Sequence, residues 1–210
     1  MNKKITLSVK DLELWFDNDY GAVKILNKIS FDIYKGETLG IVGESGCGKS
    51  MTSLCIMQLL DPTRAHVMGS IRFQGRDLLK LNDRKMQQVR GKQISMIFQE
   101  LVYVPNLSVA ENLCLGDPPR TKAGFVDWKT MREQADEILK IEHIHTTPNA
   151  MMYTVPISDA QMMEIVKATY HNAKIVIMDE PTSSLTQHES ERLFDKIRRL
   201  KEEGCAVIYI

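Results

Sequence analysis

The stretch that decides the fold is LGIVGESGCGKS, residues 39–50. Its apolar beginning predicts a short strand, and the apolar-periodic segment 51–60 that follows predicts a helix. Between them, Gly43, Gly48, Lys49 and Ser50 fit the spacing G-x-x-x-x-G-K-S of a phosphate-binding loop. A strand before this loop and a helix after it are the context that the motif requires. This context favours a ligand-binding loop over a simple glycine-rich turn.

Each residue type in this loop has a chemical reason. Glycines let the backbone turn tightly, so that successive N–H groups point at phosphate oxygens. The following helix presents its positive N-terminus to the same anion. Lys49 adds a mobile charge for the β- and γ-phosphates, and the Ser50 hydroxyl can ligate Mg²⁺. We therefore predict that a nucleoside triphosphate is bound by Gly43, Glu44, Ser45, Gly46, Cys47, Gly48, Lys49, Ser50 and Met51.

Two carboxylates follow the most apolar segment of the chain. Residues 175–178, Ile-Val-Ile-Met, predict a strand that is buried on both faces of a parallel sheet. Asp179 and Glu180 come directly after it, at the strand end where open α/β sheets bind ligands. Asp179 can hold Mg²⁺ through water, and Glu180 can polarise an attacking water. The alternative, a surface Asp-Glu pair in a turn, is disfavoured because such pairs seldom follow so apolar a strand.

The composition is that of a globular chain without excess charge. Its 210 residues suffice for one sizeable core, and 27 Lys+Arg balance 27 Asp+Glu. This balance, without a basic stripe, argues against nucleic-acid binding. No apolar run is long enough to span a bilayer, and the start of the chain does not resemble a signal peptide. The four cysteines lack C-x-x-C spacing, so we expect reduced cytosolic thiols.

The remaining segments predict strands near the N-terminus and helices beyond residue 100. Alternating apolar residues predict strands within 5–34, at 69–75 and at 94–98, the last ending on Gln99. Helices are expected at 83–90, 108–115, 128–141 and 158–170, and again between Thr186 and Gly204. Capping boxes are expected at Ser108-x-x-Glu111, Ser158-x-x-Gln161 and Thr186-x-x-Glu189.

The phosphate-binding loop, Gln99 after a strand, and the strand before Asp179-Glu180 together resemble the nucleotide-binding domain of ABC transporters. The resemblance extends over nearly the whole chain. It implies an α/β fold with a P-loop NTPase (RecA-like) parallel-sheet core, an antiparallel β subdomain and an inserted helical subdomain. Within a single domain 1–210, the antiparallel subdomain would comprise 1–35 and 65–75, the core 36–64, 76–100 and 170–210, and the helical subdomain 101–169.

The resemblance also implies a role for each matching residue. Gln99 would be the glutamine-loop residue that senses Mg²⁺ and the membrane partner, Asp179 the Walker B aspartate, and Glu180 the catalytic base. The Mg²⁺ ligands would be Ser50, Gln99 and Asp179, and residues 183–186 would be the D-loop. Tyr20, or less favourably Phe16, would stack on the adenine. From the sequence alone, Tyr20 is nearly as well explained as a turn residue that covers the sheet edge.

Two departures from the family pattern concern turnover. The signature motif, Leu-Ser-Gly-Gly-Gln, falls on residues 155–159, so Pro156 takes the serine position and Ser158 the key glycine position. Pro156, Ser158, Asp159 and Gln161 are the residues expected to face the nucleotide of a partner domain. Losing one hydrogen bond to a charged group costs about 1.5–3 kcal/mol, roughly tenfold to a hundredfold in rate. The chain also stops inside the strand that precedes the family's switch histidine, which suggests a domain truncated at its C-terminal end.

The two halves of the chain resemble different branches of the family. Residues 1 to about 100 look like the peptide/nickel importer ATPases. Residues 101–210 look like the simple-sugar (galactose or ribose type) importer ATPases, notably at 105–112, 121–127 and 172–186. A recombined chain, natural or constructed, and a single divergent sugar importer are both open interpretations.

The function implied by the resemblance is that of an ATP-binding, ATP-hydrolysing, energy-coupling subunit of an importer for a peptide, nickel or a monosaccharide. Its cofactors would be ATP and Mg²⁺. Its partners would be a second nucleotide-binding domain in a head-to-tail dimer and transmembrane permease subunits, on the cytoplasmic face of the membrane. The alternative is an ATP-binding dimerisation module, or a recombined fragment, in which hydrolysis is impaired.

Overall fold

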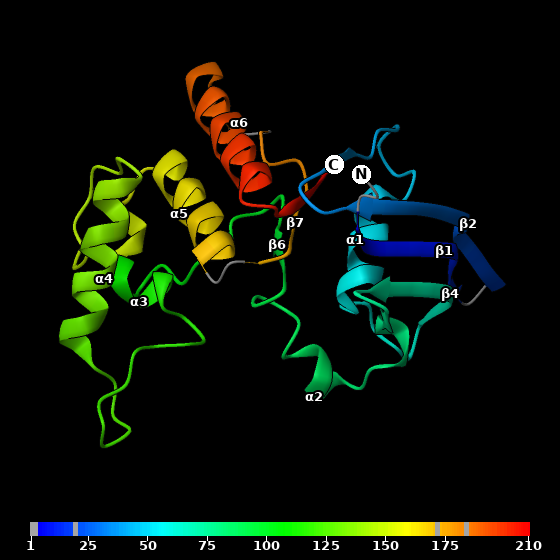
Figure 1. The fold of residues 1–210 in the computed structure, drawn as a ribbon, viewed down its shortest axis with the longest axis horizontal. Helices are drawn as coiled ribbons and strands as arrows, with labels where there is room; N and C mark the ends of the chain where they lie inside the picture. The colour runs from blue at the N-terminus through cyan, green and yellow to red at the C-terminus, as the bar shows by residue number, and fades with distance from the viewer. Residues whose placement is uncertain (1–3, 19–20, 171–172, 183–184) are drawn as a thin grey trace.

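The computed structural model describes residues 4–18, 21–170, 173–182 and 185–210. One sheet contains β1 (Ile5–Asn18), β2 (Gly21–Tyr34), β4 (Ala65–Phe73) and β5 (Arg76–Asp77), and the other contains β3 (Thr38–Gly40), β6 (Ile94–Ile97), β7 (Ile175–Met178) and β8 (Ala206–Tyr209). The helices are α1 (Lys49–Met57), α2 (Asp83–Met86), α3 (Val109–Leu113), α4 (Trp128–Ile141), α5 (Ile157–Tyr170) and α6 (Gln187–Glu202), with 3₁₀ turns at Leu78–Lys80 and Met152–Thr154. In Figure 1 the sheet of β1, β2 and β4 lies at one side, α3, α4 and α5 lie at the other, and β6, β7 and α6 lie between them.

The first sheet is antiparallel, in the order β2-β1-β4-β5, and is built on one long irregular strand. The buried side chains of β1 change phase between Val9 and Leu12, because the register against β4 shifts within residues 10–13. Asp11 in this bulge has a φ of 48°. Gly69 lies across from it, where an added Cβ would stand 2.5 Å from the Asp11 carbonyl oxygen. Only glycine therefore allows β4 to approach the bulge this closely.

The second sheet is parallel, in the order β3-β8-β7-β6. Because its strands run the same way, the segments that follow β3, β6 and β7 all leave at the same edge. These are the segments that carry the phosphate-binding loop, Gln99 and the pair Asp179-Glu180. The strand order also separates β3 from β7 by the width of β8, which leaves room for a ligand between the two loops.

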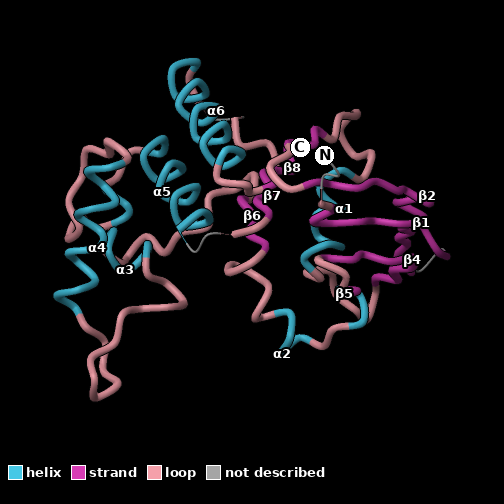
Figure 2. Tube along the Cα trace, in the orientation of Figure 1, coloured by secondary structure: helices cyan, strands magenta, loops and turns pink. Residues whose placement is uncertain are grey.

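The strand β7 is buried on both faces, as its sequence predicts. All four of its side chains are 0% exposed. Ile175 and Ile177 pack into the core that contains α1 and the antiparallel sheet, whereas Val176 and Met178 pack into the core that contains α5 and α6. The parallel sheet therefore separates the two main hydrophobic clusters, and β7 is packed from both sides. In the view of Figure 2, β7 lies between α6 and α1.

The helical segments agree with the sequence predictions except in their boundaries. The predicted bounds of α4 are confirmed, and the capping boxes at Ser108 and Thr186 are present. The predicted capping box at Ser158 is wrong, because α5 begins at Ile157 and Ser158 is therefore inside the helix and not its N-cap. The segment 83–90 is helical only over α2, and turns complete it.

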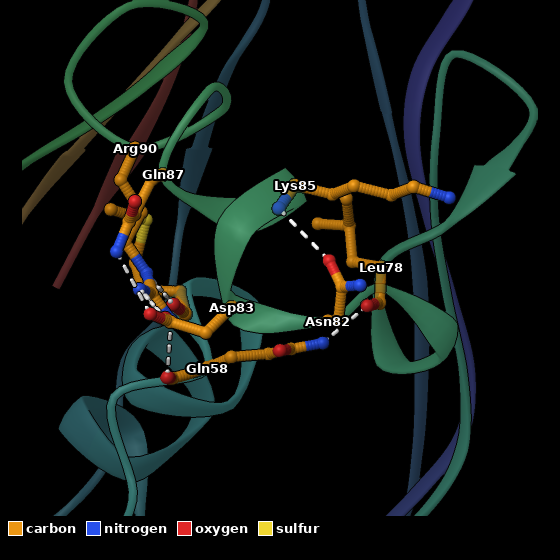
Figure 3. A network of polar contacts seen from close by, with 8 residues as sticks. Gln58, Leu78, Asn82, Asp83, Lys85, Gln87 and Arg90 are labelled. Atoms are coloured by element: carbon orange, nitrogen blue, oxygen red, sulfur yellow. Dashed lines mark hydrogen bonds and ion pairs between the residues drawn. The ribbon is translucent and has the colours of Figure 1, made fainter.

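The C-terminal end of α1 is closed by a polar network that centres on Arg90 (Figure 3). Its guanidinium donates from Nε to the Met57 carbonyl at 2.8 Å and from Nη2 to the Gln58 carbonyl at 2.7 Å. Its third nitrogen, Nη1, lies 2.7 Å from Asp83 Oδ1. A cation that satisfies the last carbonyls of a helix stabilises that helix. Arg90 therefore fixes the helix that follows the phosphate-binding loop.

Replacing Arg90 by methionine should lower the free energy of unfolding by about 2 kcal/mol, because two carbonyls lose a charged donor. Urea unfolding followed by circular dichroism measures this difference. Arg84→Met is the matched control, since Arg84 lies exposed on the neighbouring α2. Equal unfolding midpoints for the two variants would show that the cap contributes nothing.

Candidate functional site

The phosphate-binding loop connects β3 to α1, and the N–H of Cys47 within it donates to the Glu44 carbonyl at 3.3 Å. The backbone N–H groups of Gly48, Lys49 and Ser50 have no acceptor within the described residues. No side chain caps α1, whose first turn contains no acidic residue. Gly48 has a φ of 94°, and a Cβ there would lie 2.7 Å from Leu26 Cδ2. These open donors at a helix N-terminus, with no Cβ tolerated, fit an anion.

Lys49 closes the loop from the inside. Its Nζ donates to the carbonyl oxygens of Gly43 and Glu44, each at 2.9 Å. The ammonium group therefore lies against the carbonyls of the same loop whose N–H groups would bind phosphate oxygens. Of the other predicted contacts, Glu44, Ser45, Gly46 and Cys47 are exposed, and Met51 is half-buried against the core of α1.

The Ser50 hydroxyl and the Asp179 carboxylate meet, although 129 positions separate them in the sequence. Ser50 Oγ donates to Asp179 Oδ1 at 3.0 Å, and Asp179 is only 6% exposed. A hydroxyl and a carboxylate at the edge of the phosphate-binding loop are hard oxygen ligands. These donors suit Mg²⁺ that keeps water and phosphate oxygens as its other ligands. The residues present therefore fit the predicted metal. The described residues contain no cluster of three or more His, Cys, Asp or Glu side chains that could hold a metal ion.

The Glu180 side chain points at Gln99. Gln99 Nε2 donates to Glu180 Oε2 at 2.9 Å, and both residues are exposed at the sheet edge. Glu180 has a φ of 46°, and its N–H donates to the Ile210 carbonyl at 3.1 Å. A residue other than glycine in this left-handed region costs on the order of 1–3 kcal/mol, which the surrounding structure must offset. The strained backbone keeps the carboxylate outside the buried strand.

The four predicted signature residues differ in their exposure to solvent. Pro156 is exposed, and Ser158 and Asp159 are partly exposed in the first turn of α5. Gln161 is 3% exposed and donates from Nε2 to the Pro181 carbonyl at 2.7 Å. Its amide therefore faces inward in this chain, and the other three residues form the surface that a partner could reach.

The Ser158 hydroxyl contacts Glu189, which belongs to the N-terminal capping box of α6. The Glu189 carboxylate accepts the N–H and the hydroxyl of Thr186, each at 2.8 Å. The Thr186 N–H lowers the pKa of Glu189 most, followed by the Thr186 and Ser158 hydroxyls. This contact joins the start of α5 to the start of α6.

The predictions for Tyr20 and for Ser183 and Ser184 of the D-loop fall on residues outside the described ranges of the chain. Phe16, the other candidate for stacking on adenine, packs at the edge of the core around α1.

Glu164 was not singled out from the sequence. Its Oε1 accepts the N–H of Val102 at 2.7 Å. Desolvation raises the pKa of Glu164, and the Val102 N–H and Lys167 act against that rise. Burial likewise lowers the pKa of Lys167. The signal in the sequence is an acid with two apolar residues on each side in α5, MMEIV.

A groove of about 500 Å³ lies between the parallel sheet and the helical segment. Its walls include Met57, Met96, Phe98, Leu113, Glu164 and Lys167. Within the described residues, no helix is both long and apolar enough to cross a membrane. Phe98, which lines the groove, is the residue before Gln99 in the sequence.

The comparison with protein families shows the family to which the chain belongs. The model of the ABC transporter family matches residues 26–183, a stretch that includes the phosphate-binding loop, Gln99 and the pair Asp179-Glu180. The chain belongs to the ABC transporter family.

Curated relatives of this ABC transporter chain match it over 91% of its length. It is 36% identical to the ribose import ATP-binding protein RbsA of Caldanaerobacter subterraneus subsp. tengcongensis and 37% identical to the galactose/methyl galactoside import ATP-binding protein MglA 2 of Photobacterium profundum. The aligned region spans 37% of the length of each relative. The likeness of residues 1 to about 100 to peptide/nickel importers has no counterpart among these relatives and stays a prediction.

Solved structures confirm the fold class. The dimeric ATP-binding cassette MJ0796 in a post-hydrolysis state superposes with a TM-score of 0.82 at 24% identity, covering 97% of this chain and 86% of that one. The cassette MJ1267 in its ADP conformation gives 0.76 at 22% identity, covering 99% and 81%. The predicted P-loop NTPase fold, with its parallel and antiparallel sheets and added helices, is therefore correct.

Proposed function

We propose that this ABC transporter chain binds Mg-ATP and hydrolyses it to energise import of a small sugar. The observation that carries the proposal is the hydrogen bond between Ser50 and Asp179, which joins the phosphate-binding loop to the acidic strand end. The sugar class follows from the relatives, two of which are named as ribose and galactose import ATP-binding proteins. For a peptide or nickel substrate, the only support is the resemblance of the first half of the chain to peptide/nickel importer ATPases.

Different site residues would bind the phosphates, hold the metal and accept the proton. The free N–H groups at the start of α1 and the Lys49 ammonium would hold the phosphates. Ser50 and Asp179 would hold Mg²⁺, which neutralises phosphate charge when bound, and Gln99 is the third proposed ligand. Glu180 would accept a proton from the attacking water. The bond from Gln99 would keep that carboxylate oriented toward the sheet edge.

Nucleotide titration tests this function directly. We expect ATP to bind in the presence of Mg²⁺ and its affinity to fall at least about tenfold with excess EDTA, since Ser50 and Asp179 would hold the metal that neutralises phosphate charge. Isothermal titration calorimetry of the full chain measures both affinities. Binding of equal strength with and without the metal, or no binding by folded protein, would contradict the proposal.

The proposed partners are a second nucleotide-binding domain and a transmembrane permease. Pro156, Ser158 and Asp159 are the accessible residues that would face the partner's nucleotide. The groove lined by Phe98, Met96 and Leu113 offers an apolar site for a permease segment at the cytoplasmic face of the membrane. In this proposal, the antiparallel subdomain, the core and the helical subdomain have the boundaries that the sequence predicts.

A second candidate function is ATP-dependent dimerisation with little or no hydrolysis. The observation that favours it is Pro156, which has neither a hydroxyl nor a backbone N–H at the signature serine position. A recombined origin of the two halves is compatible with this candidate. The turnover rate of the unmodified chain, measured beside the Glu180 variant described below, separates the two functions.

A further inference from the structure

The two candidate catalytic side chains stand on loops that follow neighbouring parallel strands. Gln99 comes after β6 and Glu180 after β7, and a single hydrogen bond joins the two side chains. Both side chains are exposed, so solvent competes for that bond. The left-handed backbone of Glu180 must also be held by its surroundings. Contacts outside the Gln99–Glu180 pair must therefore hold the two side chains in position relative to each other.

The helix α5 contacts both loops through one face. Gln161 and Glu164 are three residues apart, so their side chains leave the helix on the same side. Gln161 Nε2 donates to the carbonyl of Pro181, the residue after Glu180, at 2.7 Å. Glu164 Oε1 accepts the N–H of Val102, three residues after Gln99, also at 2.7 Å.

The Gln161 contact is better protected than the Gln99–Glu180 pair, whereas the contact of Glu164 with the Val102 N–H is exposed. Gln161 is 3% exposed, and its bond to Pro181 is buried. Glu164 is partly buried against the groove wall. A buried carbonyl that loses its donor is costly, because no water replaces the bond.

We infer that Gln161 and Glu164 form a two-point clamp by which α5 positions the Gln99–Glu180 pair. Gln161 fixes the Glu180 loop through Pro181, and Glu164 fixes the Gln99 loop through Val102. Both are positioning residues, since each acts on the pair through a backbone group. Because Glu164 also lines the groove, the clamp connects the groove to the catalytic pair. The catalytic consequence of the clamp rests on the proposed ATPase function.

Kinetics test the clamp through variants that keep side-chain volume. Gln161→Met and Glu164→Met should each lower kcat about five- to tenfold, the effect of one lost hydrogen bond. Mg-ATP affinity should stay within about twofold, because neither residue lies in the phosphate-binding loop. Glu164→Gln keeps an oxygen acceptor for the Val102 N–H and should retain the unmodified rate. Thr169→Ala, later on the same helix, is the matched control and should change neither constant.

A double-mutant cycle distinguishes positioning from loss of structure. In the Glu180→Gln background, Gln161→Met should not lower the residual rate further, because Gln161 acts through Glu180. An equal fold-loss in both backgrounds would overturn the clamp.

Amide hydrogen exchange of the nucleotide-free protein gives a readout independent of turnover. Gln161→Met should speed exchange of the Glu180 N–H, and Glu164→Met should speed exchange of the Val102 N–H, whereas Glu164→Gln should not. Unchanged exchange at both sites overturns the clamp even if the chain hydrolyses ATP. If the unmodified chain binds no Mg-ATP, the proposed function fails and exchange alone decides on the clamp. If Gln161→Met does not fold, Glu164→Met against Glu164→Gln decides by exchange and kcat.

Discussion

Replacing Glu180 by glutamine should lower kcat for ATP hydrolysis by roughly 10²- to 10⁴-fold, the usual contribution of a general base. The amide has the size of the carboxylate and can still bond to Gln99, but it cannot accept the proton of the attacking water. Affinity for Mg-ATP should remain, because Ser50, Asp179 and the loop N–H groups are unchanged. Phosphate release measured at saturating Mg-ATP gives the rate.

The matched control for this variant is Glu191→Gln, an exposed carboxylate on α6. It should hydrolyse ATP at the unmodified rate. If Glu180→Gln and the unmodified chain release phosphate equally fast, Glu180 is not the base. If that common rate is close to the uncatalysed one while Mg-ATP still binds, the dimerisation module becomes the better function.

Replacing Lys49 by alanine should weaken Mg-ATP binding by at least about a hundredfold. The ammonium group would donate to two phosphate oxygens, and each charge-assisted bond contributes about 1.5–3 kcal/mol. In the free protein the same group bonds only to the Gly43 and Glu44 carbonyls, which water can satisfy in its absence. The loss therefore falls on nucleotide binding and not on folding.

Calorimetric titration with Mg-ATP measures this loss, and the thermal midpoint of the variant checks that it is folded. Lys122→Ala is the control, since Lys122 is exposed in the segment before α4. Affinities that agree within about threefold between Lys49→Ala and the control would remove the basis for nucleotide binding at this loop.

Local patterns sufficed for much of the fold. The four apolar residues of β7 predict burial on both faces, and the structure places its alternate side chains in two different cores. The periodicity of residues 128–141 predicts α4 with its observed ends. The capping boxes at Ser108 and Thr186 were recognisable because each involves groups only three residues apart.

The same local reasoning failed at Ser158. Its spacing to Gln161 is that of a capping box, yet α5 begins one residue before Ser158, at Ile157, and the Gln161 Nε2 donates to the Pro181 carbonyl. A partner 20 positions away cannot be seen in a local pattern. Glu164 was missed for the same reason, since its acceptor role depends on the Val102 N–H, 62 positions away.

Residue types at short spacing predicted the phosphate-binding loop and the acidic strand end, because backbone geometry within a loop or strand depends on neighbours in the chain. Only the tertiary structure brought Ser50 to Asp179, Gln99 to Glu180, and one face of α5 to the loops that contain Gln99 and Glu180. Those contacts depend on the order of the parallel strands and on which helix packs at their edge. Both are decided by burial across the whole core, which no single stretch of the sequence encodes.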